Sequence, residues 1–176
     1  MSRQRVQISV IGTSAGDPEI LRDAERVGRG IAEAGAVLVC GGLTGVMEAA
    51  SKGAAEAGGT VLAVLPTLSP ADANEFVTHA VATGTGHARN LAVVASGESV
   101  IAVGGEWGTL SEIAYARKLG RPVVALQSWP LRNRAGTDLG IVEAETAEQA
   151  VKAALSSAVV EQGSDNRTEA ADETLD

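Results

Sequence analysis

Two glycine-rich segments are the places where this sequence could bind an anion. They are CGGLTGVMEAA at residues 40–50 and VGGEWGTLSEIA at residues 103–114, and each places a GGxxG pattern between a short apolar run and a helical pattern. A helix that begins after glycines offers free backbone N–H groups and the positive end of its dipole, which together favour a phosphate. Glycines also permit any tight strand-to-helix turn, so either segment alone has two explanations. Two such segments at the carboxyl ends of neighbouring parallel strands favour a ligand site, because open α/β sheets bind ligands there.

Polar side chains near these segments could complete such a site. Gly108 and Thr109 stand where the second segment becomes helical, and the Thr109 hydroxyl could either donate to an anion or cap the helix. Arg89 carries planar donors that suit a phosphate, and Glu112 follows Gly108 by one helical turn. Arg89 could also be a solvated helix residue, and Glu112 could be an acidic residue that the helix dipole favours near the N-terminus. Neither the Walker pattern nor a GxGxxG fingerprint is present, so the common nucleotide-binding motifs do not apply.

The histidines and tryptophans give weaker indications. His87 could contact a ligand, but a histidine at a helix start is more typically solvated. His79 stands alone and no Cys, His or Asp cluster has zinc spacing, so no metal site is predicted. Trp107 could stack on a base or a pterin or lie in a subunit interface, and Trp129 could close the pocket or cover the core.

Short apolar runs alternate with helical patterns along the chain. Strands are predicted at 5–12, 36–42, 60–66, 76–83, 99–105 and 121–127, with an edge strand at 139–144, and helices at 17–35, 43–59, 87–97, 107–120 and 146–160. This alternation predicts an α/β fold in three layers: a Rossmann-like, doubly wound parallel sheet of about six or seven strands with helices on both faces. We expect one domain at 1–160.

Composition limits the classes of function. The polar end of the chain, 161–176, contains six acidic residues and Arg167, and so carries −5 of the net charge of −8; we expect it to be disordered. The remaining residues have no basic excess, which argues against a nucleic-acid-binding protein. The N-terminal apolar run is too short for a signal peptide or a membrane span, and the single Cys40 fits a reducing compartment, so we expect a cytoplasmic protein.

The combination of motifs resembles a known family. GGEWGTLSE resembles the PGGxGTxxE signature of the Lonely guy family, phosphoribohydrolases that release cytokinin bases from nucleoside 5'-monophosphates. CGGLTGVME resembles the family's first glycine motif, and ARN at 88–90 stands where the family has an Arg-Lys pair. The chain is more similar still to the related group of molybdenum cofactor carrier proteins, with its VCGGxxGVMEAA, YARN-like and GGGxGTLSEIA segments. The resemblance runs from about Val6 to Gln127.

This resemblance implies roles for two residues, and three other residues differ from the family's motifs. Arg89 matches the family's catalytic arginine and would bind the 5'-phosphate, whereas Glu112 matches its catalytic glutamate and would act on the glycosidic bond. Asn90 replaces the lysine of the Arg-Lys pair, Gly104 replaces a proline and Glu106 replaces a glycine. Losing a cation and gaining a carboxylate make the pocket less favourable for a nucleotide phosphate, so the motifs favour binding over hydrolysis.

We therefore expect a cytosolic protein that binds a phosphate-bearing, nucleotide-like small molecule, either a nucleoside monophosphate or a molybdopterin-type ligand, and requires no other cofactor. A Lonely guy-type phosphoribohydrolase and a sensor of nucleotide-like ligands are the alternatives. Apolar helices at 91–97 and 110–120 favour a homodimer or tetramer, and we expect no nucleic-acid or membrane partner. The predicted catalytic pair is Arg89 and Glu112, and the predicted ligand-binding residues are Gly12, Ser14, Gly41, Gly42, Gly45, Arg89, Asn90, Gly104, Gly105, Gly108 and Thr109.

Overall fold

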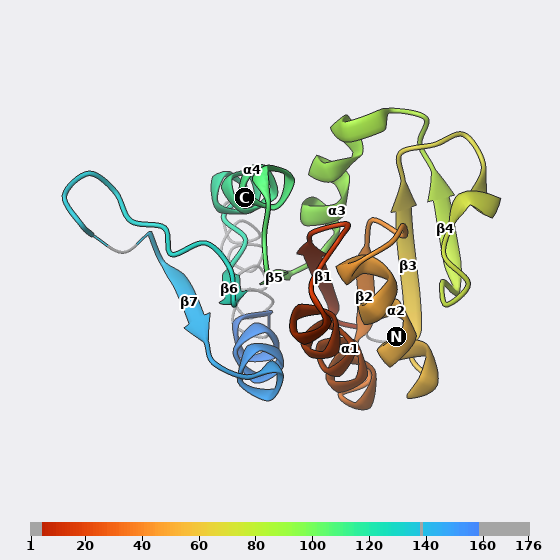
Figure 1. Ribbon diagram of the computed structural model, residues 1–176, viewed down its shortest axis with the longest axis horizontal. Coiled ribbons are helices and arrows are strands. Elements are labelled where there is room, and N and C mark those ends of the chain that lie inside the picture. Colours follow the sequence, from red (N-terminus) through yellow and green to blue (C-terminus); the bar gives the residue numbers. More distant parts are fainter. Residues whose placement is uncertain (1–4, 138, 159–176) are drawn as a thin grey trace, which may run out of the picture.

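Seven parallel strands form the centre of the protein (Figure 1). The computed structural model describes residues 5–137 and 139–158. The order of the strands in the sheet is β4-β3-β2-β1-β5-β6-β7, and every neighbouring pair is parallel. The strands are β1 (Gln7–Gly12), β2 (Val37–Cys40), β3 (Thr60–Leu65), β4 (His79–Ala82), β5 (Ser99–Val103), β6 (Val123–Leu126) and β7 (Ile141–Ala144).

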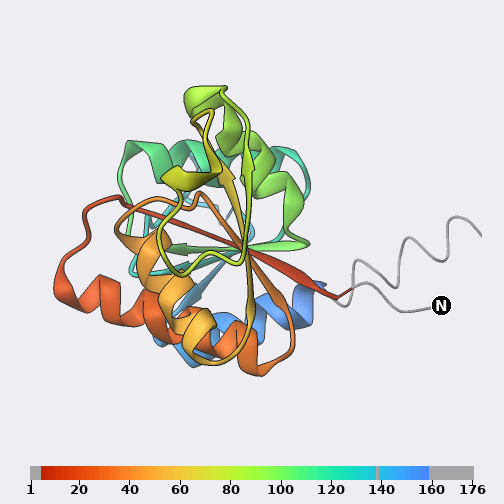
Figure 2. The ribbon, with the colours of Figure 1, turned by 90° about the vertical axis from the view of Figure 1, so that its right-hand side faces the viewer.

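Helices cover both faces of this sheet (Figure 2). On one face lie α1 (Pro18–Glu33), α2 (Val46–Glu56) and the helical residues 147–158; on the other lie α3 (Asn90–Ser96) and α4 (Trp107–Lys118). The central strands alternate between the two layers: Ile8 and Val10 of β1 pack toward α1 and α2, whereas Ile11 packs toward α3 and α4. Apolar residues on both sides of a strand are what a doubly covered parallel sheet requires.

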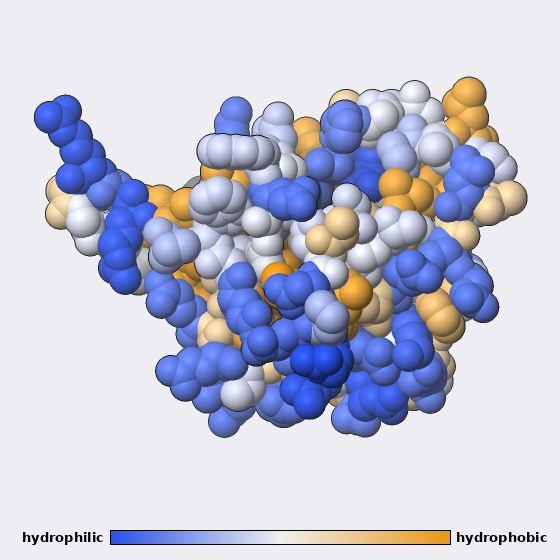
Figure 3. Space-filling model, viewed as in Figure 1, coloured by the Kyte–Doolittle hydropathy of each residue, from blue (hydrophilic) through white to orange (hydrophobic). Residues whose placement is uncertain are grey.

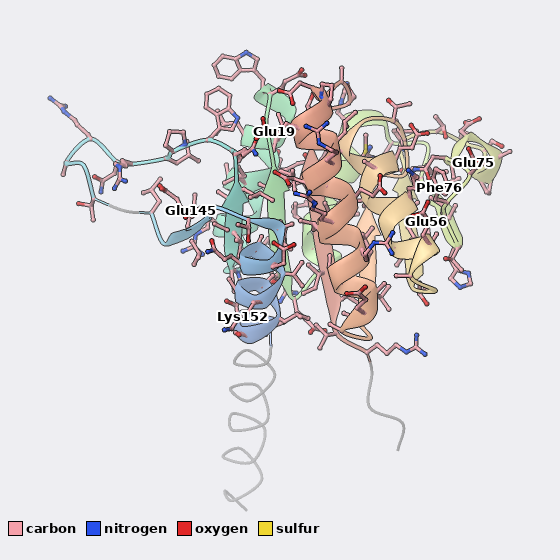
Figure 4. All side chains as sticks on the ribbon, turned by 60° about the horizontal axis from the view of Figure 1, so that its bottom comes forward. Glu19, Glu56, Glu75, Phe76, Glu145 and Lys152 are labelled. Atoms are coloured by element: carbon pink, nitrogen blue, oxygen red, sulfur yellow. The ribbon has the colours of Figure 1, made fainter. Side chains whose placement is uncertain are left out.

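The layer formed by α1 and α2 is tightly packed inside and polar outside. A Cβ added at Gly28 would strike the backbone carbonyl of Ala50, which explains a glycine in the interior of α1. The outer side is mostly hydrophilic in Figure 3, and Figure 4 shows Glu56 of α2 and Lys152 of the last helix at the surface. Arg29 joins α1 to α2 through an ion pair of 2.9 Å with Glu56. This layer therefore packs closely against the sheet and presents charged side chains to solvent.

Successive strands are added to the sheet first on one side of β1 and then, from β5 onward, on its other side. From β1 the chain proceeds outward through β2, β3 and β4, and it then returns across the sheet to β5 on the other side of β1. The connections that follow β1 and β5 therefore diverge beyond the carboxyl ends of these two strands. Open α/β sheets bind ligands in the crevice between such connections. The glycines of both glycine-rich segments lie at this edge of the sheet, directly after β2 and directly after β5.

The predicted fold class is confirmed, and the structure refines several element boundaries. The helix predicted from residue 43 begins only at Val46, because Gly45 takes φ 69° and ψ −130°, outside helical geometry. The helix predicted at 87–97 begins as a 3₁₀ turn, η2 (Gly86–Arg89), and continues as α3. A second 3₁₀ turn, η1 (Pro70–Asp72), lies in a segment for which the sequence predicted no element.

Two further predictions concern segments that extend beyond the residues that the structure describes. The acidic tail predicted at 161–176 lies outside them, and the last predicted helix is described to residue 158. Within the described ranges, none of the helices combines the length and the apolar character needed to cross a membrane.

Candidate functional site

A cavity of about 360 Å³ opens at the edge of the sheet where β1 and β5 diverge. Its walls come from four parts of the chain: β1 and the loop after it, the loop after β2 with the first turn of α2, the η2–α3 corner, and the first turns of α4. Eight of the predicted site residues line it, namely Gly12, Ser14, Gly41, Arg89, Asn90, Gly108, Thr109 and Glu112. Residues 77 positions apart in the sequence, such as Gly12 and Arg89, are therefore brought to one cavity by the strand order.

The first turn of α4 presents free backbone donors to this cavity. Glu106 is the N-cap residue of α4, in an extended conformation, and its side chain makes no capping hydrogen bond. Its carbonyl accepts from the Leu110 N–H at 3.0 Å, which closes the first helical turn. The N–H groups of the first residues of a helix have no partner within the helix, and Gly108 and Thr109 of this turn line the cavity. The arrangement suits an anion.

Two buried polar atoms beside these donors lack a hydrogen-bond partner. They are Thr109 Oγ1 and Arg89 Nε, in side chains whose residues are 2% and 8% exposed. A third such atom among the described residues, Ser128 Oγ, belongs to the loop after β6 and does not line this cavity. Leaving buried donors unpaired is costly, so native structures rarely do so without water or a ligand to satisfy them. Thr109 and Arg89 therefore indicate where a ligand would make hydrogen bonds.

Protein atoms hold the Arg89 guanidinium in position. Its Nη1 donates to Asn90 Oδ1 at 2.8 Å, and its Nη2 donates to the Gly41 carbonyl at 3.3 Å. Gly41 is needed here, since an added Cβ would lie 2.5 Å from Nη2. The asparagine that replaces the lysine of the family's Arg-Lys pair thus orients the arginine instead of adding a second positive charge.

Glu112 lies next to Arg89 and is 6% exposed. Its Oε1 is 4.0 Å from Arg89 Nη1. Burial raises the pKa of Glu112 to about 7, because a charged carboxylate is poorly solvated there, and the nearby Arg89 offsets only part of this effect. Burial also lowers the pKa of Arg89, opposed by the charge of Glu112. Near neutral pH, Glu112 therefore exchanges a proton readily: it can donate a hydrogen bond when protonated and pair with Arg89 when ionised.

Four predicted ligand-binding glycines do not line the cavity, and their geometry gives each a structural role. Gly42, Gly45 and Gly104 have φ of 72°, 69° and 61°, a region that glycine adopts without strain. Gly105 leaves room for Trp129, whose Nε1 would lie 2.8 Å from an added Cβ. Direct binding of a ligand by these four residues stays a prediction.

The structure shows where the side chains whose roles the sequence left open lie relative to the cavity. His87 and Glu106 line the outer part of the cavity, and both are exposed. The two tryptophans do not line it: Trp107, 77% exposed, lies against Trp129 with ring centroids 5.5 Å apart. Stacking of Trp107 on a ligand in this cavity is therefore not supported by its position.

Five further lining residues were missed from the sequence, namely Val10, Ile11, Thr13, Leu43 and Met47. Met47 lies in the first turn of α2 with its Sδ 3.9 Å from Arg89 Nη2, and Thr13 accepts from the Ala15 N–H at 3.1 Å through its hydroxyl. Nothing in their sequence context distinguishes Met47 from a core residue or Thr13 from a turn residue. In the part of the chain that the structure describes, no group of three or more His, Cys, Asp or Glu residues could hold a metal ion.

Comparison with known proteins agrees with the motifs and the fold. An uncharacterized protein of Archaeoglobus fulgidus is 46% identical over 154 residues, which are 88% of this chain and 97% of that protein. The molybdenum cofactor binding protein of Rippkaea orientalis is 34% identical with a TM-score of 0.79, covering 88% of this chain and 98% of that one. The molybdenum cofactor carrier protein of Chlamydomonas reinhardtii is also 34% identical, with a TM-score of 0.76 and coverage of 85% and 96%.

The family itself is shown by a match that spans nearly the whole described chain. Residues 5–162 match the family model of SLOG cluster4, and this range includes both glycine-rich segments and Arg89. The two molybdenum cofactor proteins confirm the resemblance to that group noted in the sequence. The chain belongs to the SLOG cluster4 family.

Proposed function

We propose that this protein binds a phosphate-bearing small molecule, with the phosphate at the first turn of α4. The observation that carries the proposal is the pair of buried, unpaired polar atoms, Thr109 Oγ1 and Arg89 Nε, beside the free N-terminus of that helix. A phosphate supplies several strong acceptor oxygens and a negative charge, so it satisfies both side chains and the backbone donors at once. The positive charge of Arg89 favours an anion over a neutral ligand.

The size of the cavity and the relatives favour a molybdopterin-type ligand or a nucleoside monophosphate. A volume of about 360 Å³ is near the lower end of the range for small-molecule sites, roughly 300–1,000 Å³, so one phosphate and one ring system fit better than a larger cofactor. Two similar solved structures are described as a molybdenum cofactor binding protein and a molybdenum cofactor carrier protein. These descriptions support a carrier or binding role over an enzymatic one.

Glu112 favours a second candidate function, hydrolysis of the glycosidic bond of a nucleoside monophosphate. A carboxyl group with a pKa of about 7 is suited to general acid–base catalysis at neutral pH. It lies 4.0 Å from Arg89, the residue that would anchor the phosphate. This candidate predicts release of free base and ribose 5-phosphate, which the binding role does not.

Surface side chains support a homo-oligomer as part of the proposal. Leu91 of α3, Tyr115 of α4 and Leu119 at the end of α4 are 43%, 43% and 46% exposed. Exposed apolar side chains on the helices of one layer are suited to a symmetric contact with a second copy. Light scattering coupled to size exclusion, on the wild type and on Tyr115→Arg, measures whether that surface joins the subunits.

The binding proposal is tested by isothermal titration calorimetry with inorganic phosphate, ribose 5-phosphate and nucleoside monophosphates. Two hydroxyls of α4 form a matched pair: Thr109 Oγ1 is buried and unpaired, whereas Ser111 Oγ is exposed and donates to the Gly108 carbonyl at 2.7 Å. Thr109→Val should weaken phosphate binding by about tenfold or more, roughly the value of one hydrogen bond to a charged group, while Ser111→Ala should not. Equal affinities for both variants and the wild type would show that the phosphate binds elsewhere.

Chromatography of the same mixtures separates the two candidate functions. If base accumulates with the wild type but not with Glu112→Gln, the protein is a hydrolase. If nucleotides bind and stay intact, the binding role stands and native mass spectrometry of the freshly purified protein can identify a retained ligand.

A further inference from the structure

Glu106 places an exposed carboxylate at the outer part of the candidate site. It lines the cavity, and it stands where the family motif has a glycine. Its backbone is held from two sides, because its carbonyl accepts from the Leu110 N–H at 3.0 Å and from Trp129 Nε1 at 3.3 Å. The position of this residue relative to α4 is therefore well defined even though its side chain is exposed.

The carboxylate of Glu106 is free to interact with a ligand. An acidic N-cap residue normally accepts hydrogen bonds from the first turn of its helix, but this side chain makes none. No hydrogen bond or ion pair of its carboxylate is found among residues 5–137 and 139–158. Two consequences follow: the donors of α4 remain available to an anion, and two carboxylate oxygens remain available as acceptors close by.

A free carboxylate next to a phosphate site has an energetic cost unless the ligand compensates for it. The two negative charges repel each other, so Glu106 weakens the binding of any ligand that is only an anion. A ligand that also presents N–H donors to Glu106 converts this repulsion into charge-assisted hydrogen bonds. The lining of the cavity thus combines the buried side chains of Arg89 and Thr109 with the exposed carboxylate of Glu106.

We infer that Glu106 selects ligands whose planar ring presents two adjacent N–H donors, the edge of the 2-amino-4-oxopyrimidine ring that guanine and pterins share. This edge carries a ring N–H next to an exocyclic amino group, and the pair matches the two oxygens of a carboxylate. Adenine presents an amino group next to a ring nitrogen lone pair, which a carboxylate repels. The inference rests on the proposed function, since it takes the phosphate to occupy the site at Arg89 and Thr109.

Calorimetric titration of the full chain at pH 7 tests this inference, with ribose 5-phosphate, AMP, GMP and neopterin 3'-phosphate as ligands. The wild type should bind GMP at least about tenfold more tightly than AMP, as expected for two hydrogen bonds to a charged acceptor. In Glu106→Gly, which introduces the residue of the family motif, this ratio should fall toward one. Ribose 5-phosphate should bind more tightly to Glu106→Gly than to the wild type, because a negative charge has been removed. Comparison of neopterin phosphate with GMP identifies which source of the edge the site prefers.

Glu48 provides the matched control. It is an acidic residue in the first turn of α2, which follows the other glycine-rich segment, and it does not line the cavity. Glu48→Gln should keep the GMP-to-AMP ratio of the wild type, whereas Glu106→Gln should lose it. Because Glu106 is an exposed N-cap residue without a capping bond, both of its variants should fold, and their far-UV circular dichroism checks this.

The outcomes distinguish a failure of the inference from a failure of the proposed function. If ribose 5-phosphate binds but GMP and AMP bind equally to the wild type, or if the preference for GMP survives in Glu106→Gly, the inference is wrong and the phosphate site stands. If none of the four ligands binds, the phosphate site itself is wrong. Equal binding of GMP and AMP that EDTA abolishes would instead indicate a cation between Glu106 and the phosphate, and would also overturn the inference.

Discussion

The two glycine-rich segments share a sequence pattern, yet the structure uses their helix starts differently. At the first segment, the N–H of Val46 at the start of α2 donates to the Thr13 carbonyl at 3.0 Å, so part of this helix N-terminus is occupied by the protein itself. At the second, the start of α4 is open to the cavity and makes no capping bond with its N-cap side chain. A strand-glycine-helix motif therefore offers free backbone donors to an anion only where its helix start is left open.

The last glycines of the two GGxxG patterns, Gly45 and Gly108, differ in the same way. An alanine at Gly45 would place its Cβ 2.5 Å from the Thr13 carbonyl oxygen, and an alanine at Gly41 would crowd Arg89. An added Cβ at Gly108 meets nothing within 4 Å. The first segment therefore needs its glycines for packing, while the packing of the protein gives no reason for Gly108. A ligand that approaches the backbone closely gives such a reason.

The largest expected effect comes from Gly45→Ala. Its conformation at φ 69° and ψ −130° is strained for any other residue, and the added Cβ would strike backbone atoms of Thr13 and Ser14. We expect the free energy of unfolding to fall by about 3 kcal/mol or more. Urea denaturation followed by circular dichroism measures this change, and a loss below about 1 kcal/mol would show that position 45 tolerates a side chain as position 108 does.

Gly108→Ala should show the opposite behaviour. We expect the stability of the protein to be unchanged or slightly increased, because alanine is favoured over glycine inside a helix and has room here. Phosphate binding should weaken by roughly 10- to 100-fold, since the new methyl group takes space that the ligand needs. Urea denaturation and calorimetry on the same preparation provide both values. Unchanged affinity would contradict the view that Gly108 is reserved for a ligand.

A smaller effect, dependent on pH, is expected from Glu112, which only the second segment provides. Its pKa of about 7 lies above the ordinary value of 4.5, so below pH 7 it is mostly protonated and leaves the charge of Arg89 to the phosphate. As pH rises through 7, Glu112 loses its proton, pairs with Arg89 and repels the anion. Binding should therefore weaken between pH 6 and pH 8, by at most about tenfold, since one proton is involved.

Glu112→Gln is the control for this pH dependence. Glutamine keeps the shape and cannot ionise, so the ratio of its affinity to that of the wild type should increase from pH 6 to pH 8. Using this ratio cancels the ionisation of the phosphate itself, which both proteins experience equally. A ratio that stays constant from pH 6 to pH 8 would show that Glu112 does not titrate in this range.

Most of the architecture could be predicted from the sequence because it depends on local patterns. The apolar strands and the amphipathic helix that starts at Pro18 predicted the three-layer sheet, since each element must bury its apolar side. The boundaries at Gly45 and at the η2–α3 corner could not be predicted, because they depend on backbone angles that the surrounding structure imposes. The tail at 161–176 stays a prediction.

The candidate site was only partly predictable for the same reason. Arg89, Thr109 and Glu112 were identified from residue type and motif, and the structure brings all three to one cavity. The orienting role of Asn90 was not foreseen, because it requires knowing that its Oδ1 faces Arg89 Nη1. Trp107 was a reasonable candidate from the sequence, and the structure turns it toward Trp129 instead of the cavity.

The sequence by itself determined the order of strands and helices along the chain, the two glycine-rich turns and the identity of the polar groups available for binding. Only the tertiary structure decided which of the two helix starts is open, because Val46 and Thr13 are 33 positions apart and meet only when α2 packs beside the loop after β1. Burial likewise set the chemistry of Glu112: the same carboxyl group in water would be ionised at neutral pH, and its removal from water brings its pKa to about 7. Free donors and burial both arise from residues distant in the chain, which is why they could not be obtained from the sequence alone.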